Sequence, residues 1–282
     1  MKKDRPLTIH DFKKMKERKE PITMVTAYDY PTAKLVEEAG LEMILIGDSL
    51  GMVVLGYDST IPVTLQDIIH HTKAVVRGVK NAFVVADMPF LTYQINIEKA
   101  MENAGRLIQE AGAKAVKIEG GQEIAFTVAS IVKAGIPVVG HIGLTPQSVH
   151  QLGGYKVQGK SLEEARRLLA DAKALEDAGV FSIVLEAIPG EIASWITEQL
   201  SVPTIGIGAG NTCDGQVLVF HDLVQYASNL SPKFVKPYGQ VGEMIRDSLL
   251  QYKMEVKNRD FPSKEHTFTM NEELLEQLYG KV

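Results

Sequence analysis

The sequence predicts an α/β fold, a (β/α)8 TIM barrel, from two observations. First, eight short apolar segments suit parallel strands: residues 24–28, 43–48, 83–88, 115–119, 138–142, 182–187, 204–208 and 216–220. Second, four of these segments follow a helix that ends in Ala-Gly, and glycine supplies the left-handed backbone that stops a helix. Their apolar runs are continuous rather than alternating, as in strands covered on both faces. Repeated units of helix, stop and buried strand favour a barrel.

The helices between the strands have recognisable starts. Asn96 precedes a run of apolar residues with the 3.6-residue period, and Ser161 with Glu164 forms a capping box. The last two strands are too close together for a full helix. An open doubly wound sheet is the alternative fold, but no Gly-rich turn follows the first strand to support it.

Both ends of the chain are predicted to be helical. An N-terminal helix with Thr8 and Asp11 as its cap would close the bottom of the barrel. A C-terminal helical extension begins at about residue 238 and includes a helix over 271–279. We predict one barrel domain over residues 1–282.

Composition excludes several classes of protein. Of the 282 residues, 45% are hydrophobic and 23% are charged, as in a globular protein with a sizeable core. The net charge of −5 offers no basic surface for nucleic acid or an anionic membrane. The single cysteine excludes an internal disulfide framework, and there is no apolar run for a signal peptide or membrane span. We predict a cytoplasmic protein.

Ionisable side chains end five successive predicted strands, on the face where TIM barrels carry their active sites. Three of these side chains are carboxylates, from Asp48, Asp87 and Glu119. Their repulsion at short range must be relieved by protonation or by a cation. Oxygen ligands without histidine or cysteine favour Mg²⁺, so we predict a magnesium site. The alternative is that each carboxylate caps a helix or pairs with a lysine.

The other strand ends supply Lys117, His141 and Glu186. Lys117 lies two residues before Glu119, so both side chains share one face of the strand. We predict that Lys117 binds an anionic substrate; a Schiff-base lysine and a structural counter-ion are the alternatives. Glu186 is the predicted general base, unless it only forms an ion pair. His141 either donates a hydrogen bond to substrate or has a structural role. The long loops 49–64 and 144–160 are predicted lids or substrate walls.

Six segments together resemble ketopantoate hydroxymethyltransferases: VTAYD at 25–29, GDSLGM at 47–52, ADMPF at 86–90, VKIEGG at 116–121, GHIGLTPQ at 140–147 and CDGQVLV at 213–219. The resemblance runs from about residue 8 to about 260. It implies a barrel related to the phosphoenolpyruvate/pyruvate group and a homodecamer. It also implies that a hydroxymethyl group is transferred from 5,10-methylenetetrahydrofolate to 3-methyl-2-oxobutanoate. The product would be 2-dehydropantoate, for pantothenate and coenzyme A, formed through a Mg²⁺-stabilised enolate.

The resemblance also implies roles for individual residues. The implied Mg²⁺ ligands are Asp48, Asp87 and Glu119. The implied oxo-acid site comprises Asp48, Ser49, Asp87, Lys117 and His141. Glu186 matches the proton acceptor. Three other hypotheses are a Mg²⁺ lyase or mutase of the phosphoenolpyruvate/pyruvate group, a non-catalytic oxo-acid-binding barrel, and an aldolase that uses Lys117.

Overall fold

A closed barrel of parallel strands forms the centre of the molecule in the computed structural model, which describes residues 5–226 and 232–280. In chain order, each described strand pairs with the next and β8 closes on β1, with Ile22 opposite Gly215. The strands are β1 (Ile22–Thr26), β2 (Met43–Ile46), β3 (Phe83–Asp87), β4 (Ala115–Glu119), β5 (Val138–Gly143), β6 (Ser182–Glu186), β7 (Thr204–Ile207) and β8 (Gly215–Leu218). The predicted barrel is confirmed, and the open-sheet alternative is excluded.

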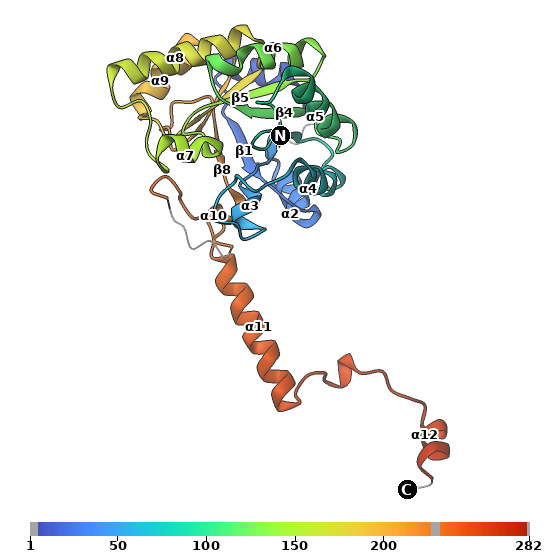
Figure 1. Cartoon of the computed structure of the whole chain (residues 1–282). Helices are drawn as coiled ribbons and strands as arrows, with labels where there is room; N and C mark the ends of the chain where they lie inside the picture. Colours follow the sequence, from blue (N-terminus) through green and yellow to red (C-terminus); the bar gives the residue numbers. More distant parts are fainter. Residues whose placement is uncertain (1–4, 227–231, 281–282) are drawn as a thin grey trace.

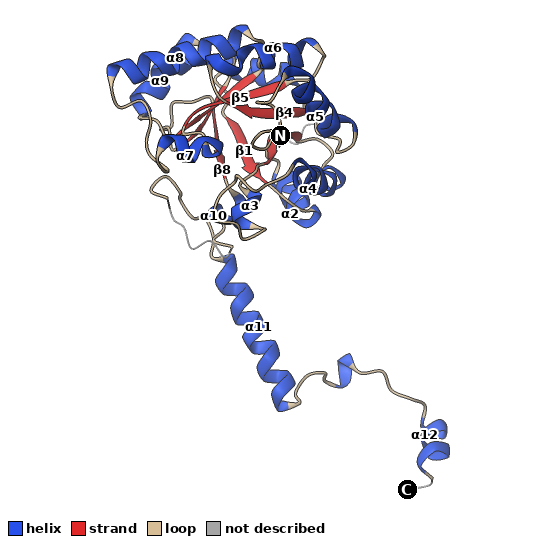
Figure 2. Ribbon diagram, viewed as in Figure 1, coloured by secondary structure: helices blue, strands red, loops and turns tan. Residues whose placement is uncertain are grey.

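Helices surround the barrel (Figures 1 and 2). The longer ones on its outside are α2 (Tyr30–Ala39), α4 (Leu65–Gly78), α5 (Ile97–Gln109), α6 (Ala125–Lys133), α8 (Leu162–Asp177) and α9 (Gly190–Gln199). Shorter turns lie in the loops: α3 (Leu50–Val53), η1 (Gln122–Ile124), η2 (Pro146–Ser148), α7 (Val149–Leu152) and α10 (Phe220–Leu223). The predicted caps are present, since Asn96 accepts from Lys99 N–H and Ser161 from Glu164 N–H.

The strands separate two apolar layers. Side chains such as Ile44 and Val84 pack outward against the helices, whereas Met43, Phe83 and Val85 fill the barrel interior. Because side chains alternate along a strand, interior positions continue toward the carboxyl ends of the strands. The same alternation therefore directs the last side chains of several strands into the barrel mouth.

The amino-terminal end of the barrel is closed by α1 (Ile9–Glu17). Phe12 and Met15 are buried in the interior cluster, and the Phe12 ring packs edge-on against Phe83 with centroids 5.3 Å apart. The helix begins with the predicted capping box of Thr8 and Asp11. The sequence-based prediction of an N-terminal closing helix is confirmed.

The C-terminal extension projects away from the barrel (Figure 1). It contains α11 (Val241–Asn258), η3 (Lys264–His266) and α12 (Glu272–Tyr279), and none of their residues is buried. No helix among the described residues combines the length and apolar composition required to cross a membrane. The helical character of the extension agrees with the prediction from about residue 238.

Candidate functional site

The predicted ionisable residues converge at the carboxyl ends of β2 to β6. Asp87 ends β3 and Glu186 ends β6, and both occupy positions that continue the interior face of their strands. The side chains are almost fully buried except for that of Glu186, which is 15% exposed against 3% for Glu119. The complete group is Asp48, Asp87, Lys117, Glu119, His141 and Glu186.

Lys117 lies among acidic side chains at the centre of this group. Its Nζ is 2.9 Å from Asp87 Oδ1 and 3.8 Å from Glu119 Oε1. The other oxygen of Asp87, Oδ2, accepts a 2.9 Å hydrogen bond from the backbone N–H of Asp48. Burial disfavours the lysine charge, but the charges of Asp87, Glu119 and Asp48 outweigh it and raise the pKa of Lys117. Lys117 is therefore held as an ammonium.

His141 lies between carboxylates from two strands. Its Nδ1 is 3.4 Å from Glu119 Oε1, and its Nε2 is 3.2 Å from Glu186 Oε2. Burial and the Lys117 charge act to lower the pKa of His141, but Glu119 and Glu186 outweigh them and raise it to about 9. This shift favours the protonated ring, whose Nε2 lies beside Glu186 Oε2 while Lys117 Nζ lies 3.2 Å from its Nδ1.

The carboxylates of the cluster are not equally easy to ionise. Burial, together with the charges of Asp87 and Glu119, raises the pKa of Asp48 well above its usual value. Burial also raises the pKa of Asp87, although Lys117 opposes it. For Glu119, burial is outweighed by His141 and Lys117, and the pKa is lowered. The cluster holds more acidic groups than its own cations neutralise, so a further cation would favour its ionised form.

The donor set suits a hard divalent cation. Mg²⁺ is commonly held by only one or two carboxylates and keeps several waters. Within the described residues, no three His, Cys, Asp or Glu side chains are spaced to hold a metal ion together. The arrangement is thus compatible with a cation held by one or two carboxylates directly and by others through water.

Ser49 lies at the edge of the cluster. Its Oγ is 2.8 Å from the hydroxyl of Tyr28, which is buried after β1. A Cβ on Gly47 would lie 2.7 Å from Ser49 Oγ, so a larger residue here would displace the Ser49 hydroxyl from its present position. The backbone of the GDS segment thereby places Asp48 and Ser49 at the mouth.

Two functional candidates were not predicted individually from the sequence, namely Gln147 and Tyr93. Gln147 Nε2 donates to Asp48 Oδ2 (2.8 Å), and the Gln147 backbone N–H donates to Glu119 Oε2 (3.0 Å). The Tyr93 hydroxyl lies 2.8 Å from Gln147 Oε1. Gln147 belongs to the GHIGLTPQ segment, which was the available sequence signal; Tyr93 offered no comparable one.

The two predicted lid segments meet beside this cluster. The hydroxyl of Tyr155, between β5 and α8, lies 3.8 Å from Met52 Sδ in α3. Burial raises the pKa of Tyr155, as do the charges of Asp48, Glu186 and Glu119. Tyr155 is therefore within electrostatic reach of the barrel mouth, as expected for a substrate wall.

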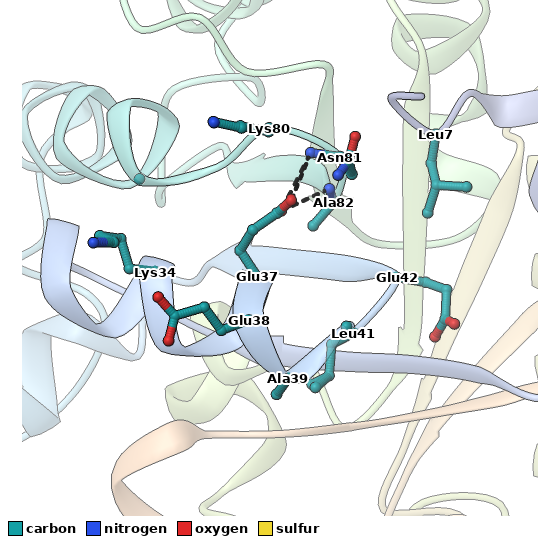
Figure 3. Close-up of a pocket in the computed structure, with 12 residues that line it drawn as sticks. Leu7, Lys34, Glu37, Glu38, Ala39, Leu41, Glu42, Lys80, Asn81 and Ala82 are labelled. Carbon is teal, nitrogen blue, oxygen red and sulfur yellow. Dashed lines mark hydrogen bonds between the residues drawn. The ribbon is translucent and has the colours of Figure 1, made fainter. Parts of the chain in front are cut away.

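A separate cavity of about 550 Å³ lies at the other end of the strands (Figure 3). It is lined by Leu7 and by residues that precede β2 and β3, including Leu41 and Ala82. Glu37 has a structural role there, because its carboxylate accepts hydrogen bonds from the backbone N–H groups of Asn81 and Ala82, just before β3. None of the predicted catalytic residues lines this cavity.

A parallel eight-stranded barrel with acid, base and ammonium groups at the carboxyl ends of its strands defines a TIM-barrel enzyme. The family model described as ketopantoate hydroxymethyltransferase matches residues 6–264. The chain therefore belongs to the ketopantoate hydroxymethyltransferase family, as its motifs suggested.

Individual relatives agree with this assignment. The 3-methyl-2-oxobutanoate hydroxymethyltransferase of Bacillus cereus is 60% identical over 270 residues, which cover 96% of this chain and 97% of the relative. The enzyme of the same name from Carboxydothermus hydrogenoformans is 58% identical over 273 residues, with 97% and 99% covered. The solved structure of 2,3-dimethylmalate lyase, described as a PEP mutase/isocitrate lyase superfamily member, has a TM-score of 0.57 at 15% identity and covers 98% of this chain and 96% of its own. This last likeness agrees with the barrel fold.

Proposed function

We propose that this chain is a 3-methyl-2-oxobutanoate hydroxymethyltransferase, which uses 5,10-methylenetetrahydrofolate and forms 2-dehydropantoate for pantothenate biosynthesis. The observation that carries the proposal is the partly exposed carboxylate of Glu186 beside His141, whose other ring nitrogen contacts the buried Glu119 and Lys117. Such an arrangement suits removal of a proton beside the carbonyl of a bound anion. The names of the close relatives support the choice of substrate.

The oxo acid would bind over Asp48, Ser49, Asp87, Lys117 and His141. Lys117 provides positive charge for the substrate carboxylate. A lysine held as an ammonium is a poor nucleophile, which disfavours the Schiff-base alternative. If Lys117 did form a Schiff base, borohydride treatment with substrate would add mass at that residue.

The predicted cation site fits the residues present. Asp48, Asp87 and Glu119 would hold Mg²⁺, some of them through water, because hard oxygen ligands are what this ion prefers. When bound, Mg²⁺ would act as a Lewis acid toward the keto group of the oxo acid. The crowding of carboxylates that raises the pKa of Asp48 would be relieved at the same time.

Glu186 would accept the C3 proton of the oxo acid. His141, 3.2 Å from Glu186 Oε2, would hold that carboxylate in place during the transfer. The resulting enolate would form a C–C bond to the one-carbon unit of the folate. Water would then replace the folate nitrogen on that carbon, which releases tetrahydrofolate and leaves the hydroxymethyl group. The two loops that meet at Tyr155 and Met52 would help to shield this step from bulk solvent.

The decisive experiment is deuterium exchange at C3 of 3-methyl-2-oxobutanoate, followed by NMR with Mg²⁺ and without folate. We expect exchange with the wild type, and we expect Glu186→Gln to slow it by about 10²- to 10⁴-fold, the usual contribution of a general base. Chelation of the metal should also abolish exchange. Glu191→Gln, on the exposed surface of α9, is the matched control and should exchange at the wild-type rate.

Exchange that continues unchanged in Glu186→Gln would show that another group is the base. Turnover of a C–C or P–C bond without folate would instead favour a lyase or mutase of the superfamily to which the structural neighbour is assigned. Binding of the oxo acid without any exchange would favour a non-catalytic barrel. A homodecameric assembly, a cytoplasmic location and a single domain over residues 1–282 remain parts of the proposal.

A further inference from the structure

Gln147 enters the acidic cluster from η2, in the loop that follows β5. It is 96% buried, and it contacts residues that follow or end three other strands. We propose that Gln147 is a positioning residue that fixes Asp48 and Glu119 relative to one another, so that their oxygens are spaced to receive a divalent cation. The inference concerns the cation that the proposed function requires, and it rests on that proposed function.

The orientation of the Gln147 amide is determined by its neighbours. Nε2 lies 2.8 Å from Asp48 Oδ2 and 3.0 Å from Met88 O. A carboxylate and a carbonyl can only accept, so the NH₂ group must face them. Oε1 then faces the hydroxyl of Tyr93 at 2.8 Å, which can donate to it. Every polar atom of the amide therefore has a partner, and the side chain has one satisfied position.

The backbone of the same residue holds the second carboxylate. The Gln147 N–H donates to Glu119 Oε2 at 3.0 Å. Tyr93 reinforces this end, because its hydroxyl accepts from Glu119 N–H at 3.2 Å. Asp48 follows β2 whereas Glu119 ends β4, so one residue ties together acids from strands that are not neighbours.

A neutral amide suits this task for an electrostatic reason. The carboxylates of Asp48 and Glu119 repel one another in a buried site, and Gln147 offers each of them an N–H without adding charge. A hydrogen bond from a fixed donor limits the rotation of a carboxylate and so fixes the direction of its second oxygen, which in Glu119 faces His141 and Lys117. Partners of this kind outside the ligand shell commonly change metal affinity by about 10- to 100-fold.

The test is the affinity for Mn²⁺, measured from the electron paramagnetic resonance signal of the free ion with the full-length protein. Gln147→Met keeps the length of the side chain but removes its donors and acceptor. We expect the Kd for Mn²⁺ to rise by about 10- to 100-fold. In the deuterium-exchange assay the same variant should recover part of its rate at high metal concentration, because the base Glu186 is intact.

Two control variants separate positioning from general stability. Gln151→Met makes the same substitution at an exposed site in the same loop, and its Kd should equal that of the wild type. Thr197→Val removes buried hydrogen bonds to Ala193 O and Thr204 Oγ1 near the start of β7, so it should lower the Tm without changing the Kd. Tyr93→Phe removes the hydroxyl from both Gln147 Oε1 and Glu119 N–H, and it should weaken Mn²⁺ binding by a smaller factor, even if Gln147→Met does not fold.

A wild-type Kd in Gln147→Met, or in Tyr93→Phe if the first variant does not fold, would overturn the inference. So would a wild-type protein that binds no Mn²⁺. If Mn²⁺ binding depends on Gln147 but the wild type exchanges no deuterium at C3, the inference stands and the proposed function fails. If the wild type exchanges deuterium and Gln147→Met does not change the Mn²⁺ affinity, the proposed function stands and the inference about Gln147 fails.

Discussion

His141 contacts carboxylates of two other strand ends, and its protonation therefore affects both sides of the site. The sequence placed this histidine at a strand end but left its role open between substrate binding and structure. The structure adds that its two ring nitrogens lie beside Glu119 and Glu186. A residue that is surrounded in this way has a protonation state set by tertiary contacts, which no local sequence pattern encodes.

The raised pKa of His141 predicts a pH-dependent contribution to stability. An imidazole titrates near 6.5 when exposed, and in the folded protein the pKa is about 9. The contribution is therefore complete below pH 6.5 and is lost as the pH rises through 9. Its size is on the order of 3 kcal/mol for a shift of this extent. We expect the Tm of chelator-treated wild type to exceed that of His141→Gln by several degrees at pH 6.5.

This difference in Tm should shrink steadily up to about pH 9.5, measured by calorimetry in matched buffers. His10→Gln, at an exposed site on α1, is the control and should follow the wild type across the range. A difference between wild type and His141→Gln that is independent of pH would show that the ring is neutral in the folded protein.

At the scale of elements, the sequence predicted most of what the structure contains. Continuous apolar runs located all eight strands, although β1 begins at Ile22 rather than at residue 24. The loop between β7 and β8 contains no helix within 208–214, as their spacing predicted. The predicted lid segments contain the short helices α3, η2 and α7, which the sequence analysis did not predict. Single helical turns are too short to show the apolar period by which longer helices are recognised. The contacts of Gln147 depend on how such turns fold back over the barrel.

The capping box of α8 offers a test at this scale. Ser161 Oγ accepts from Glu164 N–H at 3.1 Å, and Glu164 Oε2 accepts from Ser161 N–H at 3.2 Å. Ser161→Ala should destabilise the fold by about 1 kcal/mol, which lowers the Tm by about 2–4 °C in a protein of this size. Ser130→Ala is the control, because Ser130 lies inside α6 and its hydroxyl only bonds back to Phe126 O. An equal Tm loss in both variants would refute a specific role for the cap.

For the whole molecule, the barrel and the C-terminal extension differ in how they are stabilised. The barrel has a core on both sides of its strands, whereas α11 buries none of its residues. Most of the stability of a helix in a protein comes from packing of its apolar face, which α11 lacks within the part of this chain that the structure describes. Yet α11 carries a continuous apolar stripe with the spacing of one helix face, consisting of Ile245, Leu249, Tyr252 and Val256. Sequence patterns predicted the helix but could not show that it leaves the barrel.

The stripe on α11 links this extension to the proposed homo-oligomer. Exposed apolar surface of this kind commonly marks a contact with another protein, and most soluble oligomers consist of identical chains. We therefore expect Leu249→Glu, at a side chain that is 62% exposed, to lower the assembly mass measured by light scattering after size exclusion. Gln251→Glu introduces the same charge outside this stripe, although it also removes a hydrogen bond to Glu255 within the helix, and it should leave the mass unchanged. Because the barrel core does not include α11, the far-UV spectrum should stay close to wild type in both variants. An unaltered mass in Leu249→Glu would exclude α11 as a contact between copies.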